Sequence, residues 1–170
     1  MFRKAILALT LSLATPTFFA TSAHAGYTKE ELALEKDEAK YHKSVYKSVS
    51  KLTKKWHKAV DKGQKDKEKE IEKELKGYFK NELVDLKEKG ITLKEEPEKG
   101  RMDPRRPARL APADDEEKPK LEGLRDQVQK LKAGEWKDKK MGKELDDYVK
   151  TLEKRATRSM ERYKKHKKNS

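Results

Sequence analysis

The side chains best suited to chemistry in this chain are its carboxylates, its histidines and its many lysines. The 170 residues include 44 Lys and Arg, 31 Asp and Glu, 4 His and no Cys. The lack of cysteine excludes disulfides, thiolate metal sites, a cysteine nucleophile and a lipid-modified cysteine. No segment has the pattern of a phosphate loop, a dinucleotide fingerprint, an HExxH helix, an EF-hand or a nucleophile elbow. Large apolar residues are also too few to line a substrate pocket. We therefore expect a protein that is not an enzyme, with no catalytic residues and no cofactor.

A metal site would have to use histidine and carboxylate side chains. His42, His57 and His166 lie outside the first 25 residues, and none has a second histidine three or four positions away. Glu38 precedes His42 by four residues, so the two could share a cation on one helix face. Because the number of ligands decides such sites, we predict no metal site, and we expect Glu38 and His42 to be two exposed side chains at a common spacing.

Lysines form the most distinctive pattern. The stretch YHKSVYKSVSKLTKKWHKAV, residues 41–60, holds six lysines and no acid. At 100° per residue its apolar side chains fall on one side of a helix and most of its lysines on the other. A second basic concentration lies near the C-terminus. The predicted contacts to an anionic surface are the lysine stripe, Lys43, Lys47, Lys51, Lys54 and Lys58, and the basic tail, Arg158, Arg162, Lys164, Lys165, Lys167 and Lys168.

Three interpretations of the lysine stripe remain open. A free amphipathic helix would lie in a membrane surface with its apolar face down. A bundle helix with a functional lysine face would attract phosphate-rich polymers, exported nucleic acid or acidic protein segments. In the third interpretation the lysines only keep an exported protein in solution. The other apolar stripes of the chain need a partner helix, which disfavours the free helix.

The lysine stripe must be positioned by a helix of a larger helical unit. Apolar residues recur at steps of three and four over residues 27–62 and again over 64–89. Thr28 and Glu31 have the spacing of a capping box, and Gly63 and Gly90 suit helix ends. Trp56 lies on the first apolar stripe and is expected to anchor a core, as is Trp136. The spacing predicts an antiparallel hairpin over residues 26–90.

The following segment has a different composition. Prolines recur over residues 91–118 and remove backbone donors, so we expect an extended and largely disordered linker there. Helical spacing resumes at 119–170 and is interrupted at Gly134, which predicts a second hairpin whose first arm is short and whose end carries the basic tail.

The first 25 residues are typical of a secretory signal peptide. Arg3 and Lys4 precede an apolar run that ends before Pro16, and the triplet Ala23, His24, Ala25 suits cleavage after Ala25. The apolar run is too short to span a bilayer, which needs roughly 20 residues. We expect an exported protein, periplasmic or secreted, with no transmembrane anchor after cleavage.

These patterns predict an all-α protein with two antiparallel hairpins, about four helices in all. The hairpins would form one loose four-helix assembly or two semi-independent arms. The predicted function is binding of anionic surfaces, polymers or acidic proteins. The alternative is a periplasmic chaperone-like or scaffold protein that holds protein partners on an apolar, lysine-rimmed face. A protein partner or a homo-oligomer fits either prediction.

Overall fold

The chain folds into α-helices in the order expected. A computed structural model describes residues 27–94, 103–134, 136 and 139–170. These ranges hold four helices and no strand: α1 (Lys29–Asp61), α2 (Lys65–Glu88), α3 (Lys118–Ala133) and α4 (Lys139–Lys168). The prediction of an all-α protein with two helical hairpins is confirmed. The predicted signal peptide lies outside the described residues. Among the described helices, none combines the length and the apolar composition that crossing a membrane requires.

The ends of the first hairpin arise from local sequence signals. The Thr28 side chain accepts a hydrogen bond from the Glu31 backbone N–H at 3.2 Å, and the Thr28 backbone N–H donates to the Glu31 carboxylate at 2.8 Å. Gly63 and Gly90 follow α1 and α2 with φ values of 63° and 82°. Only glycine takes this left-handed conformation at little cost. The capping box and both glycine stops are therefore confirmed.

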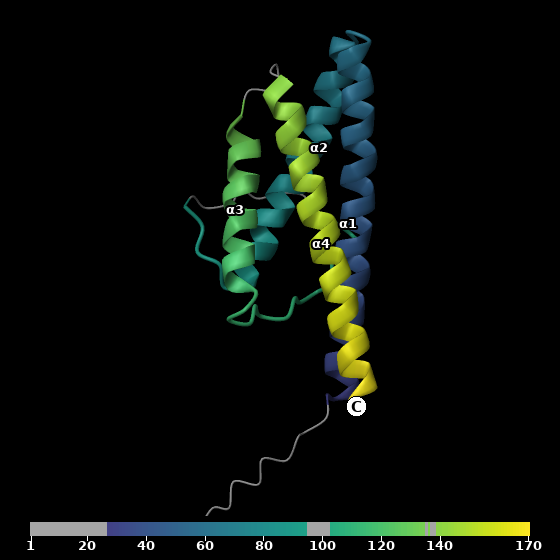
Figure 1. Cartoon of the computed structure of the whole chain (residues 1–170), viewed down its shortest axis with the longest axis vertical. Coiled ribbons are helices and arrows are strands. Elements are labelled where there is room, and N and C mark those ends of the chain that lie inside the picture. Colours follow the sequence, from purple (N-terminus) through teal and green to yellow (C-terminus); the bar gives the residue numbers. More distant parts are fainter. Residues whose placement is uncertain (1–26, 95–102, 135, 137–138) are drawn as a thin grey trace, which may run out of the picture.

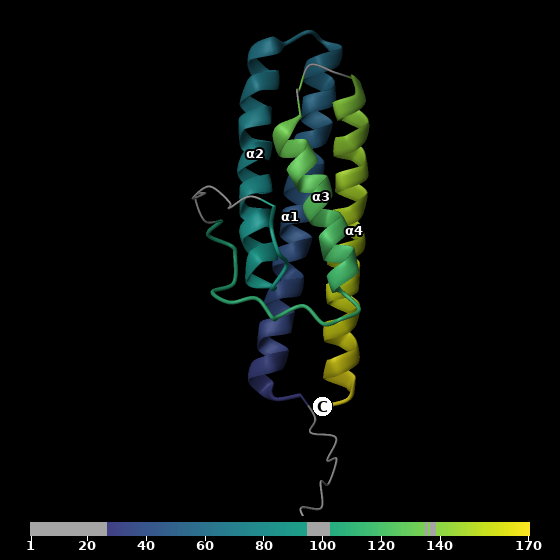
Figure 2. The ribbon, with the colours of Figure 1, turned by 90° about the vertical axis from the view of Figure 1, so that its left-hand side faces the viewer.

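The two hairpins pack together as one bundle. α1 contacts α2 and α4, and α3 contacts α2 and α4, so neighbours in the chain are also neighbours in space. Figures 1 and 2 show the helices alternating in direction. The buried apolar side chains of all four helices form one core. Of the two predicted arrangements, the single four-helix assembly is the one observed.

An aromatic cluster joins the two hairpins inside the core. Phe79 of α2 lies edge-on to Tyr148 of α4, with ring centroids 5.4 Å apart. Trp56 of α1 lies edge-on to Trp136, in the α3–α4 connection, at 6.0 Å. All four side chains are buried. Both tryptophans are therefore core anchors, as predicted, and edge-on aromatic pairs of this kind add to the stabilisation from burial.

The proline-rich segment makes contacts that its composition did not lead us to expect. Residues 95–102 lie outside the described residues, whereas 103–117 cross the lower ends of α2 and α3 in Figure 1. Leu110 is buried in the core, and the Arg106 guanidinium forms ion pairs with Asp85 and Glu88 of α2. Arg105 donates to the Tyr78 hydroxyl at 2.9 Å. Leu110, Arg105 and Arg106 are therefore among the side chains that hold this part of the segment against the helices.

Candidate functional site

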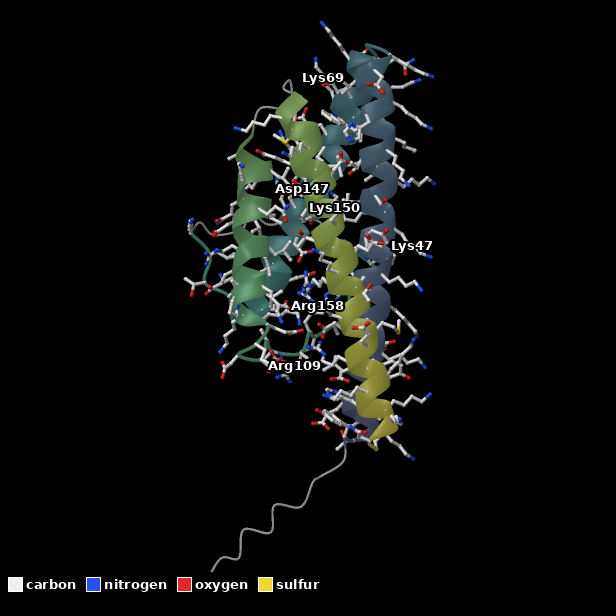
Figure 3. The ribbon with its side chains drawn as sticks, in the orientation of Figure 1. Lys47, Lys69, Arg109, Asp147, Lys150 and Arg158 are labelled. Atoms are coloured by element: carbon white, nitrogen blue, oxygen red, sulfur yellow. The ribbon has the colours of Figure 1, made fainter. Side chains whose placement is uncertain are left out.

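The lysine stripe lies on the solvent side of α1. Its five lysines are exposed, and none has an ion-pair partner among the described residues. In Figure 3, Lys47 points away from the bundle. The opposite side of α1 carries Tyr41, Val45, Val49, Leu52 and Trp56, all buried. Because these side chains hold α1 in the bundle, the lysines must face water. From Lys43 to Lys58 the stripe is about 22 Å long at 1.5 Å per residue.

The basic tail is only partly available to a ligand. Arg158, Lys164, Lys165, Lys167 and Lys168 are exposed. Arg162 instead turns inward, where its guanidinium donates to Glu117 at 2.8 Å and to Glu38 at 3.4 Å. Its predicted contact with an outside anion is therefore replaced by contacts within the bundle. These two acids lie far from Arg162 in sequence, so its position among other basic residues could not reveal the pairing.

The antiparallel packing of α1 and α4 brings the lysine stripe and the basic tail together. Lys43 and Lys164 line the same groove between the two helices, which has a volume of about 270 Å³. The groove also contains Tyr46, whose hydroxyl donates to Glu153 of α4 at 3.0 Å. The two basic regions that the sequence shows as separate therefore meet at this groove, which the acids Glu153 and Glu161 also line.

A buried ionic network lies on the opposite side of α1. Glu38 accepts a hydrogen bond from Lys89 Nζ at 2.5 Å, and both side chains are at most 2% exposed. The second Glu38 oxygen accepts from the Ala111 backbone N–H at 3.3 Å, and Lys89 also donates to the Ala111 carbonyl at 3.0 Å. The proline-rich segment is thus bonded to both members of the pair.

The network continues through α2 and α4. Arg155 of α4 forms a buried ion pair with Glu82 of α2. One turn further along α2, Asp85 accepts from the Tyr41 hydroxyl at 2.9 Å and pairs with Arg106 at 2.5 Å. Burial, together with repulsion from Glu82, raises the pKa of Asp85 to about 6. Burial alone would lower the pKa of Arg155, but Glu82 and Asp85 reverse this effect and raise it.

His42 lies at the centre of this region. Its Nδ1 is 2.8 Å from the Ser159 hydroxyl, while its Nε2 is 3.9 Å from Glu38 and has no hydrogen-bond partner in the described chain. Burial lowers the pKa of His42 well below its usual value, and the nearby charges of Arg155 and Lys89 lower it further. The imidazole is therefore neutral at neutral pH.

The expectation that Glu38 and His42 are exposed is wrong. Glu38 is 0% and His42 5% exposed, because both lie on the side of α1 that packs against α4 and the proline-rich segment. The described residues contain no group of three or more His, Asp and Glu side chains arranged to hold a metal ion. The i, i+4 spacing of Glu38 and His42 thus places both side chains in the buried network.

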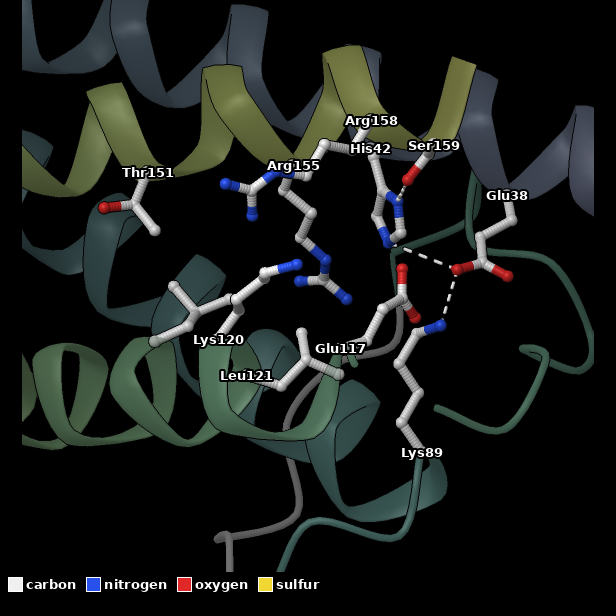
Figure 4. Close-up of a pocket in the computed structure, with 11 residues that line it drawn as sticks. Glu38, His42, Lys89, Glu117, Lys120, Leu121, Thr151, Arg155, Arg158 and Ser159 are labelled. Carbon is white, nitrogen blue, oxygen red and sulfur yellow. Dashed lines mark hydrogen bonds and ion pairs between the residues drawn. The ribbon is translucent and has the colours of Figure 1, made fainter. Parts of the chain in front are cut away.

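A small cavity lies beside His42. It measures about 40 Å³ and is lined by α1, the first two turns of α3 and α4, with Lys89 at one side. Figure 4 shows the Arg155 guanidinium between the side chains of Lys120, Glu117 and His42. The apolar part of its wall comes from Leu121 and Leu124.

Charged side chains are therefore concentrated in two regions of the described chain, the exposed lysine stripe with the basic tail and the cavity beside His42 with its ionic network. The sequence predicts the first and not the second. Comparison of this chain with protein-family models, with curated proteins and with solved structures finds no match.

Proposed function

We propose that this is an exported binding protein that attaches to anionic surfaces or polymers through the lysine stripe, with the exposed members of the basic tail extending the contact. The observation that carries the proposal is the row of five exposed lysines on α1 without ion-pair partners among the described residues. A lysine that already pairs with an acid attracts an external anion less strongly. The five lysines of the stripe have no such pair to weaken their attraction for an anion.

The chain offers an internal comparison on α2. There lysines are equally common, but they alternate with acids over residues 65–74. Mixed charges of this kind cancel within a Debye length, about 8 Å at physiological salt. The stripe on α1 has no acid between Lys40 and Val60 to cancel it. Charge arrangement therefore favours α1 as the binding face.

The chaperone-like alternative needs exposed apolar surface, and the described residues have little. The large apolar side chains that are exposed there are Tyr27 and Val60, each at 39%. The other apolar stripes are buried in the shared core. The fold therefore supports binding by charge rather than by hydrophobic contact.

Binding to vesicles that contain an anionic lipid, and to a column of an anionic polymer, tests the proposal. Replacing Lys43, Lys47, Lys51, Lys54 and Lys58 by Gln should weaken retention at least tenfold, and the binding of the unmodified protein should fall steeply with added salt. These side chains are exposed, so the substitutions should leave the fold intact.

The matched control removes the same charge elsewhere. Lys62, Lys65, Lys67, Lys69 and Lys73 are also exposed, and their replacement by Gln should cost much less binding. Equal losses in the two variants would show that only net charge matters. Binding that ignores both salt and the stripe variant would contradict the proposal.

A further inference from the structure

The cavity beside His42 contains buried donors that the bundle leaves unused. His42 Nε2 and Arg155 Nη2 have no hydrogen-bond partner among the described residues, and both side chains line the cavity. The exposed fraction of the side chain is 4% for His42 and 10% for Arg155. A buried polar group without a partner costs free energy comparable to a lost hydrogen bond. An occupant of the cavity that accepts hydrogen bonds would remove this cost.

Both unpaired atoms are donors. Arg155 Nη2 carries hydrogens at any pH of interest. For the neutral His42 ring, the Glu38 carboxylate 3.9 Å from Nε2 favours the tautomer with the proton on that nitrogen. Ser159 can then donate to Nδ1 over the observed 2.8 Å. The ring therefore presents an N–H to the cavity from one side and the guanidinium presents N–H groups from another.

The charges around the cavity favour an anion over water. Four cationic side chains line it, Lys89, Lys120, Arg155 and Arg158, against the two acids Glu38 and Glu117. Both acids already have cationic partners, since Glu38 pairs with Lys89 and Arg162, and Glu117 with Arg162.

The cationic excess resides in the other three lining cations. Lys120 and Arg158 are exposed and have no ion-pair partner among the described residues. Arg155 is paired by Glu82 through Nη1 alone. The local field therefore attracts negative charge into a space whose donors are already oriented.

The size of the cavity restricts the ligand. A single water needs roughly 10–15 Å³ of such volume, so about 40 Å³ accommodates a group of a few atoms. A guanidinium also matches the planar oxygens of a carboxylate better than a spherical ion. We propose that this cavity binds a small planar oxyanion of the size of formate or bicarbonate, held by N–H groups of Arg155 and His42 and drawn in by Lys120 and Arg158. The site shares no residue with the lysine stripe, although Arg158 also belongs to the basic tail.

The test uses sodium formate as the probe and the whole protein as the sample. Ionic strength is kept constant with sodium gluconate, whose anion is too large for the cavity. The side-chain Nε–H signal of Arg155 is followed by NMR, and the thermal midpoint is measured in parallel. We expect a saturable shift of that signal and a midpoint that rises with formate concentration.

Three variants locate the effect. Replacing both Lys120 and Arg158 by Gln removes exposed charges only and should weaken formate binding several-fold with the fold retained. Lys154→Gln, an exposed site on the same helix, should leave it unchanged. Arg155→Lys keeps a cation opposite Glu82 but removes the planar donors together with the NMR signal, so it is followed by the thermal midpoint, which should no longer rise with formate.

Two outcomes would overturn the proposal. If formate and gluconate have the same effect on the signal and on the midpoint, the cavity holds water only. If the Lys120/Arg158 variant binds formate as well as Lys154→Gln does, the cationic rim has no role. The five-lysine stripe variant should bind formate normally, so this test and the vesicle test succeed or fail separately.

Discussion

The ion pair between Glu38 and Lys89 is removed from water, so each charge depends on the other for stabilisation. The two side chains are 1% and 2% exposed, and their atoms lie 2.5 Å apart. Within a bundle, the free energy of taking one charge out of water is several kcal/mol, unless attraction to a partner charge offsets it. Arg162 contributes to Glu38 as well, at the longer distance of 3.4 Å. Lys89 is therefore the principal partner.

Replacing Lys89 by Met should destabilise the protein strongly, because it leaves Glu38 buried with only its distant second partner. We expect the free energy of unfolding in urea to fall by about 3 kcal/mol. Lys40→Met is the matched control. Lys40 pairs with Asp37 at 3.3 Å, but both side chains are about 60% exposed, and exposed pairs contribute at most about 1 kcal/mol.

A second variant separates the charge from the shape. Replacing Glu38 and Lys89 together by Met removes both charges and should recover much of the loss. If Lys89→Met costs no more than Lys40→Met, the pair is not a significant source of stability.

Spacing arguments work for the lysine stripe and fail for the buried network. The stripe follows from the period of one helix, which the sequence displays directly. Glu38 and His42 also lie on the apolar side of that helix, a signal of burial that the sequence does contain. The partners of Glu38 and His42, however, could not be predicted from the sequence. Lys89 is 51 residues from Glu38, and Ser159 is 117 from His42, so only the packing of α1 against α4 and the end of α2 brings them together.

At the scale of elements, α1 and α4 pack with little free space near the start of α4. Gly142 is buried there. A Cβ atom at this position would lie 3.3 Å from the Trp56 ring and 2.9 Å from His57. The His57 ring is partly exposed, whereas the Trp56 ring is buried in the aromatic cluster. Glycine at 142 therefore sets how near the two helices approach.

Two glycine substitutions with opposite outcomes test this contact. Gly77 lies in α2 with open space around it, so Gly77→Ala should raise the free energy of unfolding by up to about 1 kcal/mol through helix propensity alone. Gly142→Ala gains the same propensity but must displace Trp56, so it should give no increase or a loss. Equal stabilisation by both, measured in urea, would show that the α1–α4 contact accommodates a methyl group.

Helix boundaries were predicted better than the connection between the hairpins. Thr28, Gly63 and Gly90 act through neighbours in the chain, and each has the predicted role. The proline-rich segment was judged by composition, which indicates that it cannot form a helix. Composition carries no information about Arg106, whose contacts with Asp85 and Glu88 depend on α2 being in place.

At the scale of the whole molecule, the shared core makes each hairpin dependent on the other. The apolar stripes of α1 and α2 are covered by α3, α4 and Leu110 as well as by each other. We expect a single hairpin to bury too little surface to offset the loss of chain entropy. Trp56 and Trp136 also come from different halves of the chain.

A fragment of residues 27–94 should therefore have little helix by circular dichroism. Mixing it with a fragment of residues 103–170 in equal amounts should restore the helical signal and a cooperative thermal transition. The control is the second fragment carrying Leu145→Asp, at a fully buried position, which should restore neither. Cooperative unfolding of the 27–94 fragment alone would show that the first hairpin is an independent domain.

The two ends of the described chain also meet. The Tyr27 ring stacks on His166 at 3.8 Å, at the end of the bundle where α1 and α4 extend beyond the other helices (Figure 1). Each helix contacts the one before and after it, and the last contacts the first. Over the described residues the four helices thus form a nearly closed circuit of contacts, with a gap between Tyr27 and His166. Ligating the chain across that gap and cutting it at Gly63 would leave every helix with the same two neighbours, so the place where the polypeptide starts is a matter of connectivity and not of architecture.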